Sequence, residues 1–208
     1  MDNMSEKCGF VTLLGAPNAG KSTLVNYMVG AKVSIVSPKV QTTRARVRGI
    51  VVKGGCEIVL IDTPGIFKPK RRLDRAMVAA AWQEAEYSDV RLVLVDAKRG
   101  LDDDTRSIMD SLLKNKLKAV LVLNKSDLVK PARLVELSAR LNESGLFKET
   151  FMLSAATGNG VDVLENYLIS QMPESPFMFP ADQVSDLPDK LLAAEITREK
   201  LYMNLNQE

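Results

Sequence analysis

The sequence predicts an α/β fold: a mixed six-stranded sheet with one antiparallel strand and helices on both faces. Three observations predict it. Short runs rich in Val, Leu and Ile alternate with longer segments of helical periodicity. The runs are nearly continuous, as in 92–95 and 120–123, which suits parallel strands buried on both faces. Two runs are separated only by Gly54 and Gly55, which indicates an antiparallel hairpin.

The elements follow from these patterns in chain order. We expect strands at 9–14, 46–53, 56–61, 90–95, 119–123 and 150–153. We expect helices at 21–30, 73–87, 103–114, 131–142, 161–171 and 190–202. Four prolines fall between 173 and 188, which is typical of an extended linker on the domain surface. The predicted organisation is therefore a main domain at 1–173, a linker at 174–188 and one amphipathic helix within 189–208, which either packs back on the main domain or opens a second one.

Composition narrows the possible chemistry. The 208 residues are 46% hydrophobic and 26% charged with a net charge of +2, as in an ordinary globular protein. Cys8 and Cys56 lack a metal-binding spacing and are expected to be reduced core residues. The sequence contains no histidine, which excludes Ser-His-Asp, Cys-His and His-ligated metal chemistry. The first seven residues lack the features of a secretory signal, and no apolar run approaches the ~20 residues needed to span a bilayer.

A phosphate-binding loop pattern lies between the first strand and the first helix. Its backbone N–H groups and the helix dipole can cradle the α- and β-phosphates of a nucleotide. Lys21 can reach the β- and γ-phosphate oxygens, and the Ser22 hydroxyl can hold Mg²⁺. A glycine turn followed by a surface lysine is the alternative, which only motifs further along can exclude. The residues expected to bind nucleotide here are Gly15, Ala16, Pro17, Asn18, Ala19, Gly20, Lys21, Ser22 and Thr23.

An acidic motif, Asp62-Thr63-Pro64-Gly65, follows the third predicted strand. Open α/β sheets bind ligands at the carboxyl ends of their strands. There the Asp62 carboxylate can serve the outer coordination sphere of Mg²⁺, and the Gly65 N–H can approach the γ-phosphate. Alone the motif would be a turn, but after a phosphate loop it is interpreted as the acidic partner of that loop.

Asn124-Lys125-Ser126-Asp127 follows the predicted apolar strand at 119–123. This motif resembles the guanine-recognition box of translation-factor-like and Ras-like GTPases. The Asp127 carboxylate can accept from the N1–H and the exocyclic amine of guanine, a pair that adenine does not offer. The Lys125 stem can cover the base, and Asn124 can tie its loop to the phosphate loop. The alternative is a polar helix-capping loop. The small-residue box of the same family is matched by Ser154, Ala155 and Ala156.

The four motifs together resemble Era-type ribosome-assembly GTPases over essentially the whole chain, and imply a Ras-like P-loop GTPase fold. The resemblance implies a switch that binds GTP and GDP, hydrolyses GTP with Mg²⁺, and contacts small-subunit ribosomal RNA and the ribosomal subunit. It also implies that 37–44 is the first switch, in which Thr43 closes on Mg²⁺, with Thr42 as the alternative. Segment 194–200 would enter an RNA-binding KH domain, which would be cut short at Glu208; no GxxG loop follows Gly65.

Three further expectations concern the assembly and the location of the protein. The protein is expected to be a monomer. It is expected to be cytoplasmic. Peripheral association with the inner membrane is kept as an alternative.

The catalytic residues follow less directly from the sequence than the binding residues do. Ras-like enzymes position water with a Gln after the Asp-x-x-Gly motif, but Ile66 stands there. Asn18 matches the residue that coordinates K⁺ in a related tRNA-modification GTPase, or else only shapes the loop. The expected catalytic residues are Lys21, Thr43, Gly65 and Asn18.

Two other functions, and two roles for one charged segment, are the alternatives. The rivals are an ATP-dependent kinase or ATPase and a nucleotide-gated binding module with negligible hydrolysis. The cations of 68–72, with Arg75, lie in the expected second switch and either contact RNA or are simply solvated.

Overall fold

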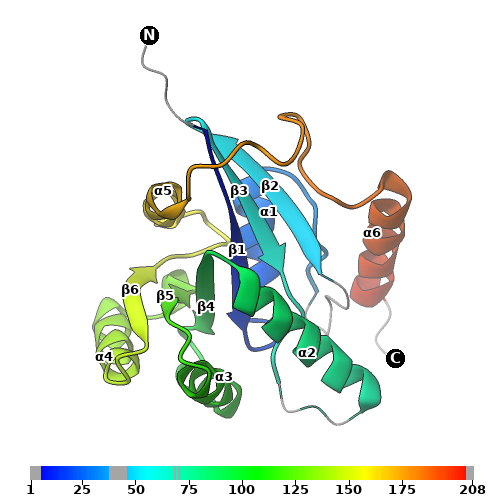
Figure 1. Cartoon of the computed structure of the whole chain (residues 1–208). Coiled ribbons are helices and arrows are strands. Elements are labelled where there is room, and N and C mark those ends of the chain that lie inside the picture. The colour runs from blue at the N-terminus through cyan, green and yellow to red at the C-terminus, as the bar shows by residue number, and fades with distance from the viewer. Residues whose placement is uncertain (1–5, 38–45, 68, 70, 205–208) are drawn as a thin grey trace.

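The computed structural model describes residues 6–37, 46–67, 69 and 71–204, and in these the chain forms a six-stranded sheet (Figure 1). The strand order is β2-β3-β1-β4-β5-β6, and only β2 and β3 pair antiparallel. The predicted fold class is confirmed. The strands are β1 (Lys7–Gly15), β2 (Val47–Lys53), β3 (Cys56–Asp62), β4 (Val90–Asp96), β5 (Ala119–Asn124) and β6 (Phe147–Met152). The last strand begins three residues before the predicted start at 150, because Phe147 already pairs with Ala119.

The helices cover both faces of the sheet. They are α1 (Lys21–Val29), α2 (Arg72–Tyr87), α3 (Asp103–Lys114), α4 (Pro131–Asn142), α5 (Val161–Gln171) and α6 (Asp189–Asn204). Local chemistry sets their ends. Asp102 caps α3 by accepting the Thr105 N–H at 2.8 Å, Pro131 occupies the first turn of α4, and α1 stops at Gly30 in the left-handed region.

Two apolar clusters hold the layers together. One joins α1 and α5 to one face of the sheet through side chains such as Leu24, Leu164 and Leu168. The other joins α2, α3 and α4 to the opposite face through side chains such as Ala81, Ile108 and Leu141. Burying each of these leucines contributes about 1.5–3 kcal/mol, so both faces of the sheet are fixed by packing.

The segment after α5 runs along the sheet, and we call residues 174–188 the strap. It is more than a linker, because it forms β-bridges through Glu174 with Lys7 and through Ser185 with Gly49. The Ile50 N–H also donates to the Val184 carbonyl at 3.0 Å. The strap therefore adds short strand pairs to the sheet.

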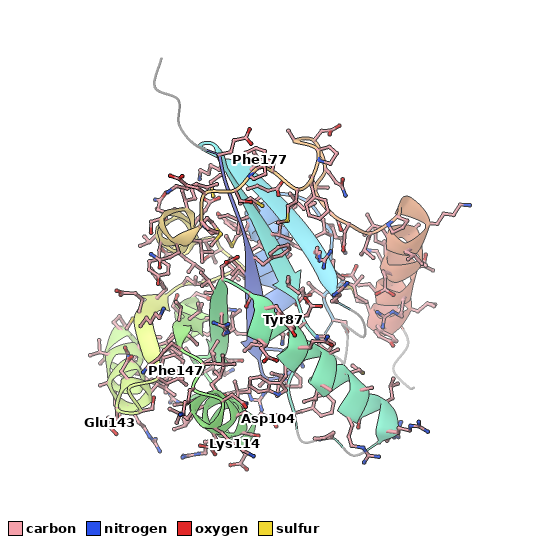
Figure 2. The ribbon with its side chains drawn as sticks, viewed as in Figure 1. Tyr87, Asp104, Lys114, Glu143, Phe147 and Phe177 are labelled. Carbon is pink, nitrogen blue, oxygen red and sulfur yellow. The ribbon has the colours of Figure 1, made fainter. Side chains whose placement is uncertain are left out.

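A buried carboxylate, that of Glu57 on β3, anchors the middle of the strap. It accepts the Met178 N–H at 2.9 Å, the Phe179 N–H at 3.1 Å and the Cys8 thiol at 3.0 Å. Burial, then the contact with Glu57, raises the pKa of Cys8 to about 12, so this thiol stays protonated and keeps its donor. Figure 2 labels Phe177 on this part of the strap.

The C-terminal helix α6 packs back on the main domain, one of the two arrangements that the sequence left open. The buried Glu199 carboxylate forms an ion pair with Lys32 and accepts the Val36 N–H at 2.9 Å. Both partners lie in the segment after α1, so α6 is held beside the chain that leads to residue 38. The assignment of α6 to a KH domain, and the domain boundaries, remain predictions.

Candidate functional site

A cleft of about 350 Å³ lies at the carboxyl ends of the central strands, a size typical of small-ligand sites. It is where the sequence places the phosphate loop and the motifs after β3 and β5. The lining residues are Pro17, Asn18, Gly20, Lys21, Ser22, Thr23, Ile35, Val36, Ser37, Thr63, Gly65, Lys125 and Met203. The cleft thus joins three of the predicted motifs, and α6 contributes Met203 to its wall.

The phosphate loop is held in an unusual backbone shape. Asn18 and Gly20 both have positive φ, 64° and 99°, and the Ala19 N–H donates to the Ala16 carbonyl at 3.2 Å. A Cβ at position 20 would lie 2.1 Å from the Asn124 amide nitrogen. Glycine is therefore required at position 20 both for its conformation and for the close approach of Asn124.

Lys21 is buried at the start of α1 and folds back on the loop. Its Nζ donates to the Gly15 carbonyl at 3.0 Å and to the Ala16 carbonyl at 3.2 Å. Burial lowers the pKa of Lys21 to about 8, and the Asp62 carboxylate only partly opposes this. An anion beside Nζ would relieve the cost of burying the ammonium, so Lys21 is suited to a phosphate.

The oxygen groups that could hold Mg²⁺ are clustered. The Asp62 Oδ2 atom accepts from the Ser22 hydroxyl and from the Ser34 hydroxyl, each at 2.6 Å. Hydroxyl and carboxylate oxygens are the ligands that Mg²⁺ prefers. Among the described residues no cluster of three or more His, Cys, Asp or Glu side chains could hold a metal by itself. These residues fit Mg²⁺ that also takes ligands from phosphate and water.

The motif after β3 is packed against the phosphate loop. A Cβ at Gly65 would lie 2.9 Å from the Pro17 backbone, and the Ile66 N–H donates to the Gly15 carbonyl at 3.0 Å. The Thr63 hydroxyl donates to the Leu13 carbonyl at 2.7 Å, and Pro64 is buried. The Ile66 side chain is buried in the α2–α3–α4 cluster, so it belongs to the core.

Asn124 ties three loops together. Its amide donates to the Ala19 carbonyl at 2.8 Å, and its side-chain oxygen accepts the Ala155 N–H at 2.9 Å. The tie to the phosphate loop that the sequence predicts is present. Because the Ala155 N–H donates to Asn124 and the Ser154 N–H donates to the Asn159 carbonyl at 2.9 Å, the contact of the small-residue box with a guanine carbonyl, which remains a prediction, would have to come from Ala156. Ser154 is buried beside Ala155, and Ala156 is exposed.

Lys125 and Asp127 are the next residues of the motif that follows β5. The Lys125 Nζ atom donates to the Asn18 carbonyl at 2.8 Å, and its stem lines the cleft. Asp127 is exposed on the 3₁₀ turn Ser126–Leu128, where its carboxylate can meet a base.

Several predicted residues lie elsewhere. Thr43 and Thr42 of the expected first switch fall outside the described residues, as do Lys68 and Lys70. Arg71, Arg72 and Arg75 are described and exposed around the start of α2.

Sequence reasoning missed two polar residues of this site. Asp96 ends β4 and pairs with Lys125, and it follows an apolar strand as Asp62 and Asn124 do, so the same pattern could have found it. Ser34 lies in an irregular segment, and nothing in the sequence marks its contact with Asp62.

Comparison with known proteins decides the family. The family model for 50S ribosome-binding GTPases matches residues 10–125. GTPase Era of Afipia carboxidovorans is 57% identical over the whole chain, which covers 69% of that protein. GTPase Era of Brucella suis is 54% identical over 97% of the chain and 65% of that protein. The chain belongs to the GTPase Era family. It spans about two thirds of the length of these Era relatives.

Solved Era structures agree with the fold. A crystal structure of Era in complex with MgGDPNP and nucleotides 1506–1542 of 16S ribosomal RNA matches 98% of this chain and 69% of that chain, with a TM-score of 0.92 and 38% identity. An Aquifex aeolicus Era variant bound to GDP and AlF4⁻ matches 97% of this chain and 69% of that chain, with a TM-score of 0.90 and 38% identity. Across the described helices, none is both long and apolar enough to cross a membrane.

Proposed function

We propose that this chain binds GTP with Mg²⁺ in the cleft and hydrolyses the β–γ phosphoanhydride by attack of water, as a molecular switch. The observation that carries the proposal is the bridge made by Asn124. One buried side chain joins the phosphate loop at Ala19 to the small-residue box at Ala155. A site for phosphates and a site for a guanine base are thereby held at a fixed separation.

The chain's own residues divide the work. The phosphate loop binds the phosphates, and Lys21 contacts the β- and γ-phosphate oxygens. Ser22 and Asp62 would hold the Mg²⁺ ion that accompanies the nucleotide. When bound, Mg²⁺ supplies positive charge against the negative charge that develops on the phosphate oxygens. The Gly65 N–H approaches the γ-phosphate. Thr43, with Thr42 as the alternative, closes the first switch over it.

The element that positions the attacking water is the open point of this mechanism. The Ile66 side chain is buried and has no hydrogen-bonding group, so it does not replace the usual Gln. Asn18 lines the cleft and is proposed to help bind K⁺. The cation would neutralise the charge that develops between the β- and γ-phosphates. Comparing kcat in K⁺ with kcat in Na⁺ tests this. A several-fold higher rate in K⁺ is expected, and equal rates would exclude the cation.

The main test is multiple-turnover release of phosphate from GTP by the full chain. We expect turnover that needs Mg²⁺ and is lost in Lys21→Ala, whereas Lys116→Ala, on the exposed turn after α3, keeps the parent rate. GTP binding without turnover, with and without RNA, would favour the second candidate. That candidate is a nucleotide-gated binding module with negligible hydrolysis, and the buried Ile66 is the observation in its favour.

The partners are also proposals. An Era relative was crystallised with 16S ribosomal RNA, and we propose small-subunit ribosomal RNA and the ribosomal subunit as partners here, mainly through a KH domain that begins at α6. Arg71, Arg72 and Arg75 are exposed and offer a second contact. Replacing them by Gln is expected to lower RNA affinity and to reduce its salt dependence, whereas an unchanged salt slope would mean that they are only solvated. A monomeric, cytoplasmic protein, with peripheral inner-membrane association as the alternative, remains the prediction.

A further inference from the structure

We propose that Asp96, at the carboxyl end of β4, is a positioning residue that holds Lys125 against the phosphate loop. Its Oδ2 atom accepts from the Lys125 Nζ atom at 2.7 Å, and the same Nζ donates to the Asn18 carbonyl at 2.8 Å. One ammonium is thus shared between an acid and the backbone of the loop. The inference rests on the proposed nucleotide site, since it concerns how that site is kept in its binding shape.

The Asp96 carboxylate is itself held in place. Its Oδ1 atom accepts the Lys98 N–H at 2.9 Å, and its carbonyl accepts the Gly100 N–H at 2.8 Å. Its side chain is 10% exposed, whereas that of Lys125 is 31% exposed. Asp96 also pairs with Asn124 across the β4–β5 ladder. These contacts therefore hold the Asp96 carboxylate in one position, from which it orients the Lys125 side chain.

Lys125 needs such a partner. Its backbone has φ 63°, in the left-handed region that residues other than glycine rarely adopt. The stem lines the cleft where a base would stack, so the side chain must extend along the cleft wall. Asp96 binds the far end and leaves a long, flexible side chain little freedom. This conformation covers the base site and reaches the loop simultaneously.

The connection between β4 and α3 also contacts the carbonyl of Pro17, the residue before Asn18 in the loop. Arg99 donates from Nη1 to the Pro17 carbonyl at 3.3 Å, and its Nη2 is paired with Asp102 at 2.7 Å. In a trans peptide the N–H points opposite the carbonyl, so the Asn18 N–H points away from Arg99. Two cations, each paired with an aspartate, thus bind two successive carbonyls of the phosphate loop and help to fix its backbone shape.

The test uses the full chain and the release of a fluorescent (mant) GDP, followed by stopped flow. Asp96→Asn keeps the shape of the side chain and its bond to Lys98 but removes the charge that faces Lys125. Loss of a charge-assisted hydrogen bond predicts release faster by roughly tenfold. Asp110→Asn, an exposed acid on α3, is the matched control and should release GDP at the parent rate. Asp96→Glu restores the charge and should recover part of the affinity.

A double-mutant cycle with Lys125→Met separates positioning from general support. If Asp96 acts through Lys125, Asp96→Asn has little further effect once Lys125 is Met. Equal effects of Asp96→Asn in both backgrounds, or release at the parent rate in Asp96→Asn, would overturn the inference. Failure of the unmodified chain to bind mant-GDP would instead overturn the proposed function. If Asp96→Asn does not fold, the cycle is run with Asp96→Glu: release moderately faster than the parent when Lys125 is present, with no further acceleration in Lys125→Met, is expected, and equal acceleration in both backgrounds overturns the inference.

Discussion

The nucleotide cleft and the α6–strap side of the domain are held together in different ways. In the cleft, hydrogen bonds link several loops in a closed network, as when Asn124 joins Ala19 to Ala155. On the other side, single carboxylates accept backbone N–H groups: Glu57 holds the strap, and Glu199 holds the chain after α1 to α6. The cleft is therefore held by a network between loops, whereas one buried carboxylate anchors the strap, together with its β-bridges, and another anchors α6.

The largest expected effect is in the cleft. Asn124→Ala removes a donor to Ala19 and an acceptor for Ala155, both buried. Each loss is worth about 1–3 kcal/mol, so we expect the Kd of GDP to rise by roughly 100-fold or more. Isothermal titration calorimetry measures it. Asn142→Ala, which removes hydrogen bonds to Ser138 and Thr150 on the surface, should leave the Kd unchanged. Similar Kd values for both variants would contradict the closed network.

Glu57→Gln tests the anchor of the strap. An amide NH₂ replaces one acceptor oxygen and faces a donor, so we expect a loss of about 1–3 kcal/mol in the free energy of unfolding, with faster proteolysis between 174 and 188. Urea unfolding and limited proteolysis measure these effects. The GDP affinity should change by less than about twofold, because the cleft network is untouched. The control is Glu136→Gln on the exposed face of α4. A large loss of GDP affinity in Glu57→Gln would show that the two regions are not separable.

Glu199→Gln should have a smaller and more local effect. It removes the ion pair with Lys32, which is largely exposed, and weakens the bond to Val36, for an expected loss of about 1 kcal/mol. Hydrogen exchange should increase in α6 and at Val36 and stay unchanged in the core strands. Unchanged exchange at Val36 would mean that packing alone holds α6.

The smallest expected effect is a weakening of the docking of α6 at acidic pH. Burial acts to raise the pKa of Glu199, but the bonds from Lys32 and Val36 outweigh it and lower the pKa below its ordinary value of 4.5. The contribution of the Glu199 charge to the docking of α6 is therefore fully present above that value and is lost as pH falls through the lowered pKa. The Val36 amide resonance should shift only in this acidic range, and in Glu199→Gln it should not titrate. A shift of this resonance near neutral pH would contradict the assignment.

Most of the fold and the main motifs could be predicted from the sequence because they are local. Continuous apolar runs mark strands buried on both faces, and the phosphate loop and the guanine box are short, contiguous patterns. The sequence shows that the Ile66 side chain cannot bind water, but only the structure places that side chain in the core.

The rest depends on contacts between distant residues. A glutamate within a strand, such as Glu57, gives no sign in the sequence that strap amides 121 and 122 residues away will bind it. The same holds for Glu199 and Val36, which are separated by 163 residues. Asp96 is the exception, because its place after an apolar strand repeats the pattern of Asp62 and Asn124.

We propose that this cleft selects guanine through the Asp127 carboxylate. The most direct test is competition of GDP, XDP and ADP against mant-GDP for the parent chain, and against a fluorescent XDP for Asp127→Asn. We expect that the parent prefers GDP strongly over ADP and XDP, and that Asp127→Asn binds XDP better than GDP. Equal binding of ADP and GDP by the parent, or an unchanged preference in Asp127→Asn, would contradict it.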